Sequence, residues 1–341
     1  MASAFDIKKN EILDINRKLA FACIDAAEPG NIKRARERFI KDVEKRRNNP
    51  TYIAQGGSSL CGAAAFMYCI AREKPDDFAL YALDLALTGK GHLGGLEVTP
   101  GQTCRDSESL SIDASFFFTQ KRTIAPADWV TLASLRDSTG SLSAMPSVNS
   151  DLGGMTFPDA LAGWFRGTGW FSAVRNNADI LGFNDSLRHL LGINSLPLSY
   201  VCLLINASVM TGDLALRIPN HWVVLGDGAG QGGGSNGNDG STIRIATPGA
   251  KILDSRGRPV MIVPKVETPY QHEIAPRVSC LPDSPACVAN SGDPRASRRA
   301  ELEKGKLNFE VYSWAEIRRH PADLTVEKFL TGYFGYVAAT V

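Results

Sequence analysis

The sequence has almost no net charge, because 37 lysine and arginine residues are offset by 36 aspartate and glutamate residues among 341. A balanced chain lacks the strong positive field with which proteins attract nucleic acids or anionic membrane surfaces. It also lacks an apolar run of the length that a bilayer span requires. We therefore expect no nucleic acid partner and no membrane span.

The cysteines show no CxxC spacing and are odd in number, at positions 23, 61, 69, 104, 202, 280 and 287. This pattern argues against a zinc cluster, and we expect no metal or other cofactor. Cys280 and Cys287 are close enough in sequence to form a disulfide, whereas the others stand in apolar surroundings. The pattern indicates a reducing compartment during folding.

The first eight residues, Met1 to Lys8, lack the charged and then apolar pattern of a secretory signal peptide. We therefore expect synthesis in the cytoplasm without such a signal. Any export would use a route that recognises another feature of the chain.

Helical patterns dominate the first half of the chain, and strand patterns dominate the second half. Apolar spacing and helix-start signals predict helices within 6–48, interrupted at 29–31, and over 61–73, 75–88, 126–135 and 175–192. Apolar and β-branched runs predict strands at 198–206, 220–225, 241–246, 260–263, 308–312 and 333–341. Helices followed by strands are typical of an α+β fold.

Composition divides the chain into a charged helical segment, 1–48, and one large domain, 49–341. Within that domain, 226–240 is a glycine-dominated loop, and the proline-containing segment 270–307 is predicted to be a surface insertion. Three roles stay open for residues 1–48. They are a chaperone-binding arm, an inhibitory segment or a part of the domain.

The most informative segment runs from Gln55 to Phe66 and places a glutamine and a small-residue turn before Cys61 at the start of an apolar helix. A helix N-terminus favours the thiolate, which is the nucleophilic form of cysteine. The amide of Gln55, six positions upstream, could help to hold the oxyanion that forms when Cys61 attacks a carbonyl. The alternative is a buried cysteine after an ordinary loop.

A cysteine nucleophile needs a base, and imidazole has a suitable pKa near neutrality. Of the five histidines, only His221 heads an apolar strand, 221–225, whose backbone would fix its position. His92 stands in a glycine-rich connection, His189 in a predicted helix, and His272 and His320 in polar segments. His221 is therefore the candidate base, and its alternative role is a hydrogen-bonded histidine at a strand end.

In order and spacing, these residues resemble the papain-like cysteine peptidases. Gln55 precedes Cys61 at a helix start, and the strand-borne His221 follows 160 residues later, somewhat beyond the roughly 130–150 of that class. The segment Tyr312-Ser313-Trp314 is similar to the family's Asn-Ser-Trp-Gly, whose asparagine orients the histidine. The resemblance implies a papain-like fold, with a helical half carrying Cys61 packed on an antiparallel sheet carrying His221.

The chain departs from the family at the third catalytic position, because Tyr312 stands where the family has asparagine and Ala315 follows Trp314. Ser313, Thr247, Asp227 and Asp239 are all candidates, and a Cys-His dyad without a third member is a further alternative. We favour Ser313, because it follows a strand that could pair with the strand of His221. A hydroxyl would orient the imidazole without stabilising its charge as a carboxylate would.

Among papain-like proteins the chain looks most like bacterial effectors or toxins delivered by specialised secretion machinery, on the segments 60–64, 128–137 and 220–225. The resemblance implies a cysteine peptidase or amidase with a protein or peptide substrate. It also implies secretion into a target cell, with an immunity protein or a secretion chaperone as partner. The alternatives are a glutamine deamidase or transglutaminase, a peptidoglycan amidase, and a catalytically silent papain-like binding module.

Overall fold

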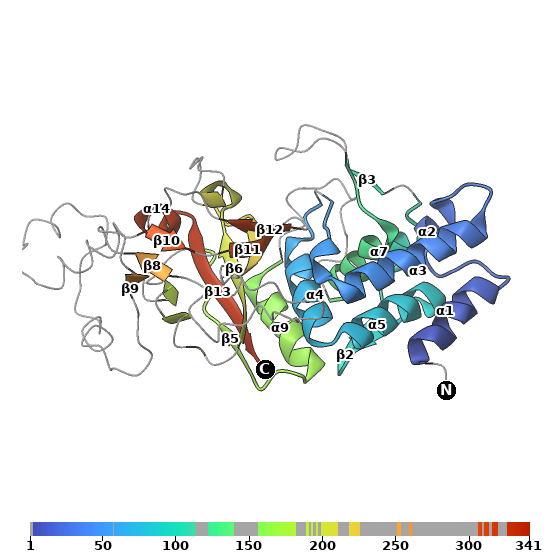
Figure 1. Cartoon of the computed structure of the whole chain (residues 1–341), viewed down its shortest axis with the longest axis horizontal. Coiled ribbons are helices and arrows are strands. Elements are labelled where there is room, and N and C mark those ends of the chain that lie inside the picture. Colours follow the sequence, from blue (N-terminus) through green and yellow to red (C-terminus); the bar gives the residue numbers. More distant parts are fainter. Residues whose placement is uncertain are drawn as a thin grey trace, which may run out of the picture.

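The computed structural model describes residues 3–56, 58–108, 110–112, 122–139, 156–181, 189–190, 192–193, 196, 199–210, 218–225, 251–253, 259–260, 306–308, 310–313, 316–319 and 326–341. Helices of the first half of the chain pack on an antiparallel sheet formed by the second half (Figure 1). The predicted α+β class is therefore confirmed.

The helical part contains the amphipathic helix α3, the apolar helices α4 and α5, the helices α1 and α9, and several short turns. Its members are α1 (Ala4–Asp14), α2 (Ala22–Ala26), α3 (Ile32–Asn48), a 3₁₀ turn (Pro50–Tyr52), α4 (Cys61–Glu73), α5 (Pro75–Thr88), α6 (Gln102–Asp106), α7 (Pro126–Asp128), a π turn (Trp129–Ala133), α8 (Ser134–Thr139) and α9 (Pro158–Thr168). Two further turns accompany the sheet, a 3₁₀ turn (Ala207–Met210) and α14 (Val326–Leu330).

The main sheet has six antiparallel strands in the order β12-β11-β7-β6-β13-β5. Their bounds are β5 (Ala173–Asn176), β6 (Ser199–Ile205), β7 (His221–Leu225), β11 (Glu310–Ser313), β12 (Glu316–Arg319) and β13 (Tyr333–Thr340). The central strands β6 and β7 are buried along their whole length. Three small sheets are formed by β1 (Gly91–Leu93) with β2 (Leu96–Val98), by β3 (Ser111–Ile112) with β4 (Arg122–Thr123), and by β8 (Lys251–Leu253), β9 (Pro259–Val260) and β10 (Lys306–Asn308).

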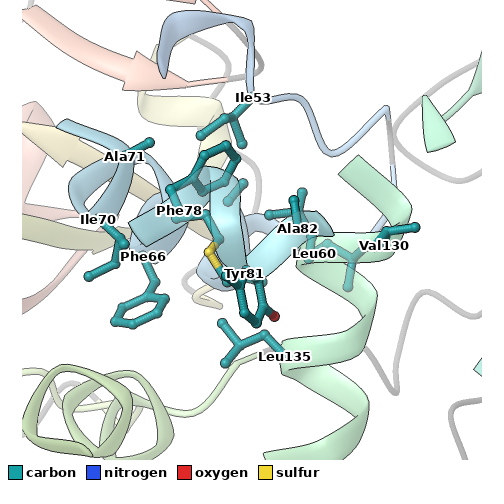
Figure 2. Close-up of a cluster of buried hydrophobic side chains, with 14 of the residues drawn as sticks. Ile53, Leu60, Phe66, Ile70, Ala71, Phe78, Tyr81, Ala82, Val130 and Leu135 are labelled. Atoms are coloured by element: carbon teal, nitrogen blue, oxygen red, sulfur yellow. The ribbon is translucent and has the colours of Figure 1, made fainter. Parts of the chain in front are cut away.

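The two faces of the main sheet belong to two different hydrophobic clusters. Trp222 and Val224 of β7 join the large cluster that includes α4 and α5, whereas Val223 and Leu225 join a smaller cluster with Phe329 of α14. This division follows from the alternation of side chains along a strand. Helix α4 lies between the sheet and the other helices, and all its residues from 61 to 71 are buried. Figure 2 shows part of the large cluster, in which side chains of α4 and α5 meet Ile53, Leu60, Val130 and Leu135.

The N-terminal helices contribute to the same core as α4. Phe5 and Ile12 of α1 and Phe39 of α3 are buried in the large cluster, and α1 and α3 both contact α5. A buried ion pair adds a polar link, because Arg46 donates two hydrogen bonds to the carboxylate of Asp128 at 2.7 and 2.6 Å. Residues 4–48 are thus packed into the helical layer.

The predicted helices 61–73 and 75–88 are confirmed to the residue. Strands β6, β7 and β13 confirm three predicted strands within one residue at each end. The helix predicted for 175–192 is wrong at its start, because Ala173–Asn176 forms strand β5. The first predicted helix is likewise interrupted between α1 and α2, and the connection around His92 is the β1–β2 hairpin. The predicted strand 241–246 lies outside the described residues, as does the predicted insertion 270–307 except for its last two residues, which belong to β10.

Candidate active site at the start of helix α4

The segment before α4 forms a tight buried turn. The backbone N–H and the hydroxyl of Ser58 both donate to the carbonyl oxygen of Gln55, at 2.9 and 2.6 Å. Gly56 has a φ of 63° in the left-handed region, which glycine adopts without strain. A side chain at this position would also press on the backbone of Thr123 and Ile124. The turn thus fixes Gln55, whose side chain is buried, just upstream of the helix.

Cys61 is the first residue of α4, at the end where helical N–H groups lack intrahelical partners. Within the described part of the chain no side chain caps this helix, whose N-cap residue is Leu60. The backbone groups of Cys61 itself, of Gly62 and of Trp222 in β7 instead lie near the sulfur and favour its anionic form. The sulfur therefore lies where the start of the helix meets the start of a strand.

The net effect of these surroundings is to raise the pKa of the Cys61 thiol, and burial is the main cause. The backbone hydrogen bonds from Trp222 and Gly62 and the charge of Arg136 act in the opposite direction. The start of the helix thus lowers the pKa of the thiol, as the sequence indicates, but burial of the anion raises the pKa by more. Burial of Cys61, which is 4% exposed, thus favours the neutral form of its thiol.

His221 is the first residue of β7 and is also buried. Trp222, its neighbour in the chain, faces the large cluster that contains Cys61. His221 pairs with Ile205 of β6, and side chains of directly paired residues share one face. Its Cβ therefore starts on the face opposite to Trp222, at the end of the strand. The backbone of Trp222 lies close enough to the sulfur of Cys61 to affect the pKa of its thiol.

Strand β11 ends at the same end of the sheet at which β7 begins. Tyr312 pairs with Val224, and β11 stops one residue later at Ser313. The register thus puts Ser313 near the start of β7, on the strand that neighbours it. The other candidates for the third catalytic position, Thr247, Asp227 and Asp239, lie outside the described residues, as does Trp314.

Sequence reasoning missed two side chains at this site, Arg136 of α8 and Thr156. Arg136 interacts with the sulfur through its charge. Thr156 accepts a hydrogen bond from the Trp222 indole at its carbonyl oxygen, at 2.8 Å, and its side chain packs on Gly62. Arg136 stands in the segment 128–137, whose resemblance to effectors gives no sign of a contact with Cys61, and Thr156 falls in a stretch that is loop-like by composition. Only the fold brings them to Cys61.

Among the residues that the structure describes, no group of three or more histidine, cysteine, aspartate or glutamate residues could hold a metal ion. None of the helices there has the length and hydropathy to cross a membrane. Comparisons of the chain with protein-family models, curated proteins and solved structures give no match.

Proposed function

We propose that this protein is a papain-like cysteine hydrolase, a peptidase or amidase, with Cys61 as nucleophile and His221 as base. The observation that carries the proposal is the position of the Cys61 sulfur. It lies at the first residue of α4, where backbone groups of Gly62 and of Trp222, the neighbour of His221, favour its anionic form. A nucleophile beside a helix N-terminus with a histidine adjacent is the arrangement that acyl transfer to a thiol requires.

The reaction would proceed by acyl transfer. The thiol proton of Cys61 passes to His221 as the sulfur bonds to the carbonyl carbon, and the π electron pair moves onto the oxygen. Gln55 and the N–H groups at the start of α4 would stabilise the resulting oxyanion. The C–N bond then breaks, the amine leaves with the proton from His221, and water hydrolyses the thioester.

The raised pKa of Cys61 makes a permanent thiolate–imidazolium pair unfavourable in the free protein. We therefore infer that His221 deprotonates the thiol only as the substrate binds. For that transfer, the imidazole must reach the sulfur from the start of β7. Ser313, at the end of the neighbouring strand, is the proposed residue that orients it.

The test uses p-nitrophenyl acetate, which releases p-nitrophenolate when its acyl group moves to a thiol. The full chain should show a burst of product and an acetyl group on Cys61, located by mass spectrometry of its peptides. Cys61→Ala should abolish the burst. Cys104→Ala is the matched control, because Cys104 is equally buried at 4% exposure and burial also raises its pKa. An equal burst from wild type and Cys61→Ala would contradict the proposal.

Products formed from protein substrates then separate the reaction classes. New peptide termini indicate a peptidase, ammonia release indicates a deamidase, and cleaved muropeptides indicate a peptidoglycan amidase. Expression of wild type and Cys61→Ala in a bacterial cytoplasm and in a periplasm tests the proposed role as a secreted toxin. Toxicity that depends on Cys61 in one compartment would identify where its target lies.

A second candidate is a papain-like module that binds a partner without turnover, and the burial of Cys61 favours it. Acyl transfer distinguishes the two, because only a hydrolase completes it. Acetylation of Cys61 by p-nitrophenyl acetate, with Cys104 unmodified, supports the hydrolase. A folded chain that p-nitrophenyl acetate never acetylates at Cys61 supports the silent module.

A further inference from the structure

Thr156 occupies a corner between the two elements that hold the Cys61 sulfur. Its carbonyl oxygen accepts a hydrogen bond from Nε1 of Trp222 at 2.8 Å. On the other side, its side chain packs so closely on Gly62 that a Cβ added there would overlap both Cβ and Oγ1 of Thr156. Trp222 and Gly62 are also the residues whose backbone groups favour the anionic form of the sulfur. Thr156 therefore adjoins the site from the side of the first turn of α4.

The hydroxyl of Thr156 differs from those of other buried threonines. The residue is 2% exposed, and within the described structure Oγ1 makes no hydrogen bond. Thr131 and Thr168 are just as buried, but their hydroxyls donate to the helix carbonyls of Ala127 and Phe165 at 2.9 and 2.8 Å. An unpaired buried hydroxyl destabilises the folded state. Such a group beside a nucleophile is available to a ligand.

The surroundings of the Thr156 hydroxyl favour a ligand oxygen that carries negative charge. The N–H groups at the start of α4 and the positive end of its dipole point to the site. The guanidinium of Arg136 adds positive charge near the sulfur. A hydroxyl in this surrounding acts best as a donor. The acyl oxygen of a thiol hydrolase substrate gains such charge when the sulfur attacks.

We propose that Thr156 donates a hydrogen bond from Oγ1 to the acyl oxygen of the substrate and to the oxyanion formed from it. This inference rests on the proposed function of Cys61. Thr156 transfers no proton in the step: the C–S bond forms, the carbonyl π pair moves to oxygen, and the thiol proton goes to His221. The hydroxyl keeps its proton and stabilises the oxygen until the leaving-group bond breaks and the carbonyl re-forms.

The experiment compares two reactions of the same sulfur in the full chain. Acetylation by p-nitrophenyl acetate forms an oxyanion, whereas alkylation by iodoacetamide forms none. Thr156→Val keeps the shape of the side chain and removes the hydroxyl. We expect it to slow acetylation of Cys61 by about 10²–10³-fold, as loss of an oxyanion donor does, and to leave alkylation unchanged. Thr156→Ser should restore most of the acetylation rate.

Stability gives an independent readout. Since the hydroxyl is unpaired, Thr156→Val should keep or raise the urea midpoint of unfolding. The matched control is Thr168→Val, because Thr168 stands at the other end of α9 and its hydroxyl is paired. Thr168→Val should lower the midpoint and leave the acetylation rate unchanged. If the Thr156 hydroxyl had only a structural role, Thr156→Val and Thr168→Val would not have opposite effects on the urea midpoint and on the acetylation rate.

Three outcomes separate the claims. Slow acetylation of Thr156→Val with normal alkylation supports the inference. Normal acetylation of Thr156→Val, with wild type acetylated at Cys61, overturns the inference and leaves the proposed function intact. Wild type that is never acetylated at Cys61 overturns both.

Discussion

The start of α4 differs from the starts of α1 and α3. Helix α1 begins with a capping box, in which Ser3 and Asp6 bond to each other's backbone N–H groups. Helix α3 begins with Asn31, whose side chain accepts from the N–H of Arg34 at 3.0 Å. Helix α4 begins instead after Leu60 with no side-chain cap, and the backbone of its first residues favours the anionic form of the Cys61 sulfur.

This difference extends to the other long helices. Helices α5 and α9 start with proline and carry aspartate in the first turn, which complements the helix dipole. The first turn of α4 contains only cysteine, glycine and alanine. The N-termini that only build the fold are thus satisfied by caps or acids, whereas the N-terminus of α4 leaves its positive end to the thiol. The residues in the first turn of α4 are therefore explained by the position of that turn in the fold and not by the stability of the helix.

The largest expected effect comes from breaking the anchor of the segment that leads to α4. Asp128 holds the buried guanidinium of Arg46 and also accepts from the backbone of Ala54. Asp128→Asn leaves a buried charge uncompensated, so we expect a loss of about 3–5 kcal/mol in the free energy of unfolding. Urea denaturation measures it. The control is Asp76→Asn, which breaks the exposed pair with Arg47 and should cost about 0–1 kcal/mol. Equal losses would refute the anchor.

The next effect concerns activity rather than stability. Gln55→Ala should reduce the rate of acyl transfer to Cys61 by about 10²–10³-fold, because it removes a proposed oxyanion donor. The turn itself should persist, since both bonds of Ser58 go to the backbone carbonyl of Gln55. Acetylation kinetics together with the urea midpoint test this. A folded Gln55→Ala variant with the wild-type rate would remove Gln55 from the mechanism.

A smaller effect tests the close packing of the first turn. Gly62→Ala places a methyl group into Thr156, so we expect a loss of about 1–3 kcal/mol through overpacking and slower acyl transfer. Gly163→Ala in α9 is the control, because no described atom lies within 4 Å of its added Cβ. That variant should gain about 0.5–1 kcal/mol from the lower entropy of alanine in a helix. Thermal unfolding of both variants shows whether the two signs differ as expected.

The smallest effect is expected at the start of α3, which is one of the capped helix N-termini. Asn31→Ala removes the cap of α3, which typically costs about 1 kcal/mol. Because this cap lies in the N-terminal helices, acetylation of Cys61 should keep its wild-type rate. A change in that rate would show that the start of α3 influences the site and is more than a structural cap.

The sequence was sufficient where local signals are strong. Pro75 fixes the start of α5 and thereby the end of α4, which stops at Glu73. Gly89 ends α5 with a φ of 74°. The placement of Cys61 at a helix start and of His221 at a strand start follows from the same kind of signal. These are properties of neighbouring residues, so they can be predicted without the fold.

Features that depend on distant partners could not be predicted. The break between α1 and α2 coincides with a hydrogen bond from the N–H of Ala20 to the carbonyl of Ala86, at 2.8 Å. Strand β5 exists because Ala173–Asn176 pairs with β13, far along the chain. The raised pKa of Cys61 and the contact of Thr156 with Gly62 also arise from tertiary packing. Local patterns contain no information on these contacts.

The position of β13 has a consequence for the timing of assembly. Residues 333–340 form the strand that lies between β6 and β5, and β6 in turn supports β7 beside the thiol. During synthesis, Cys61 and His221 therefore leave the ribosome before residues 333–340, so β7 gains the full support of the sheet only after β13 has been made.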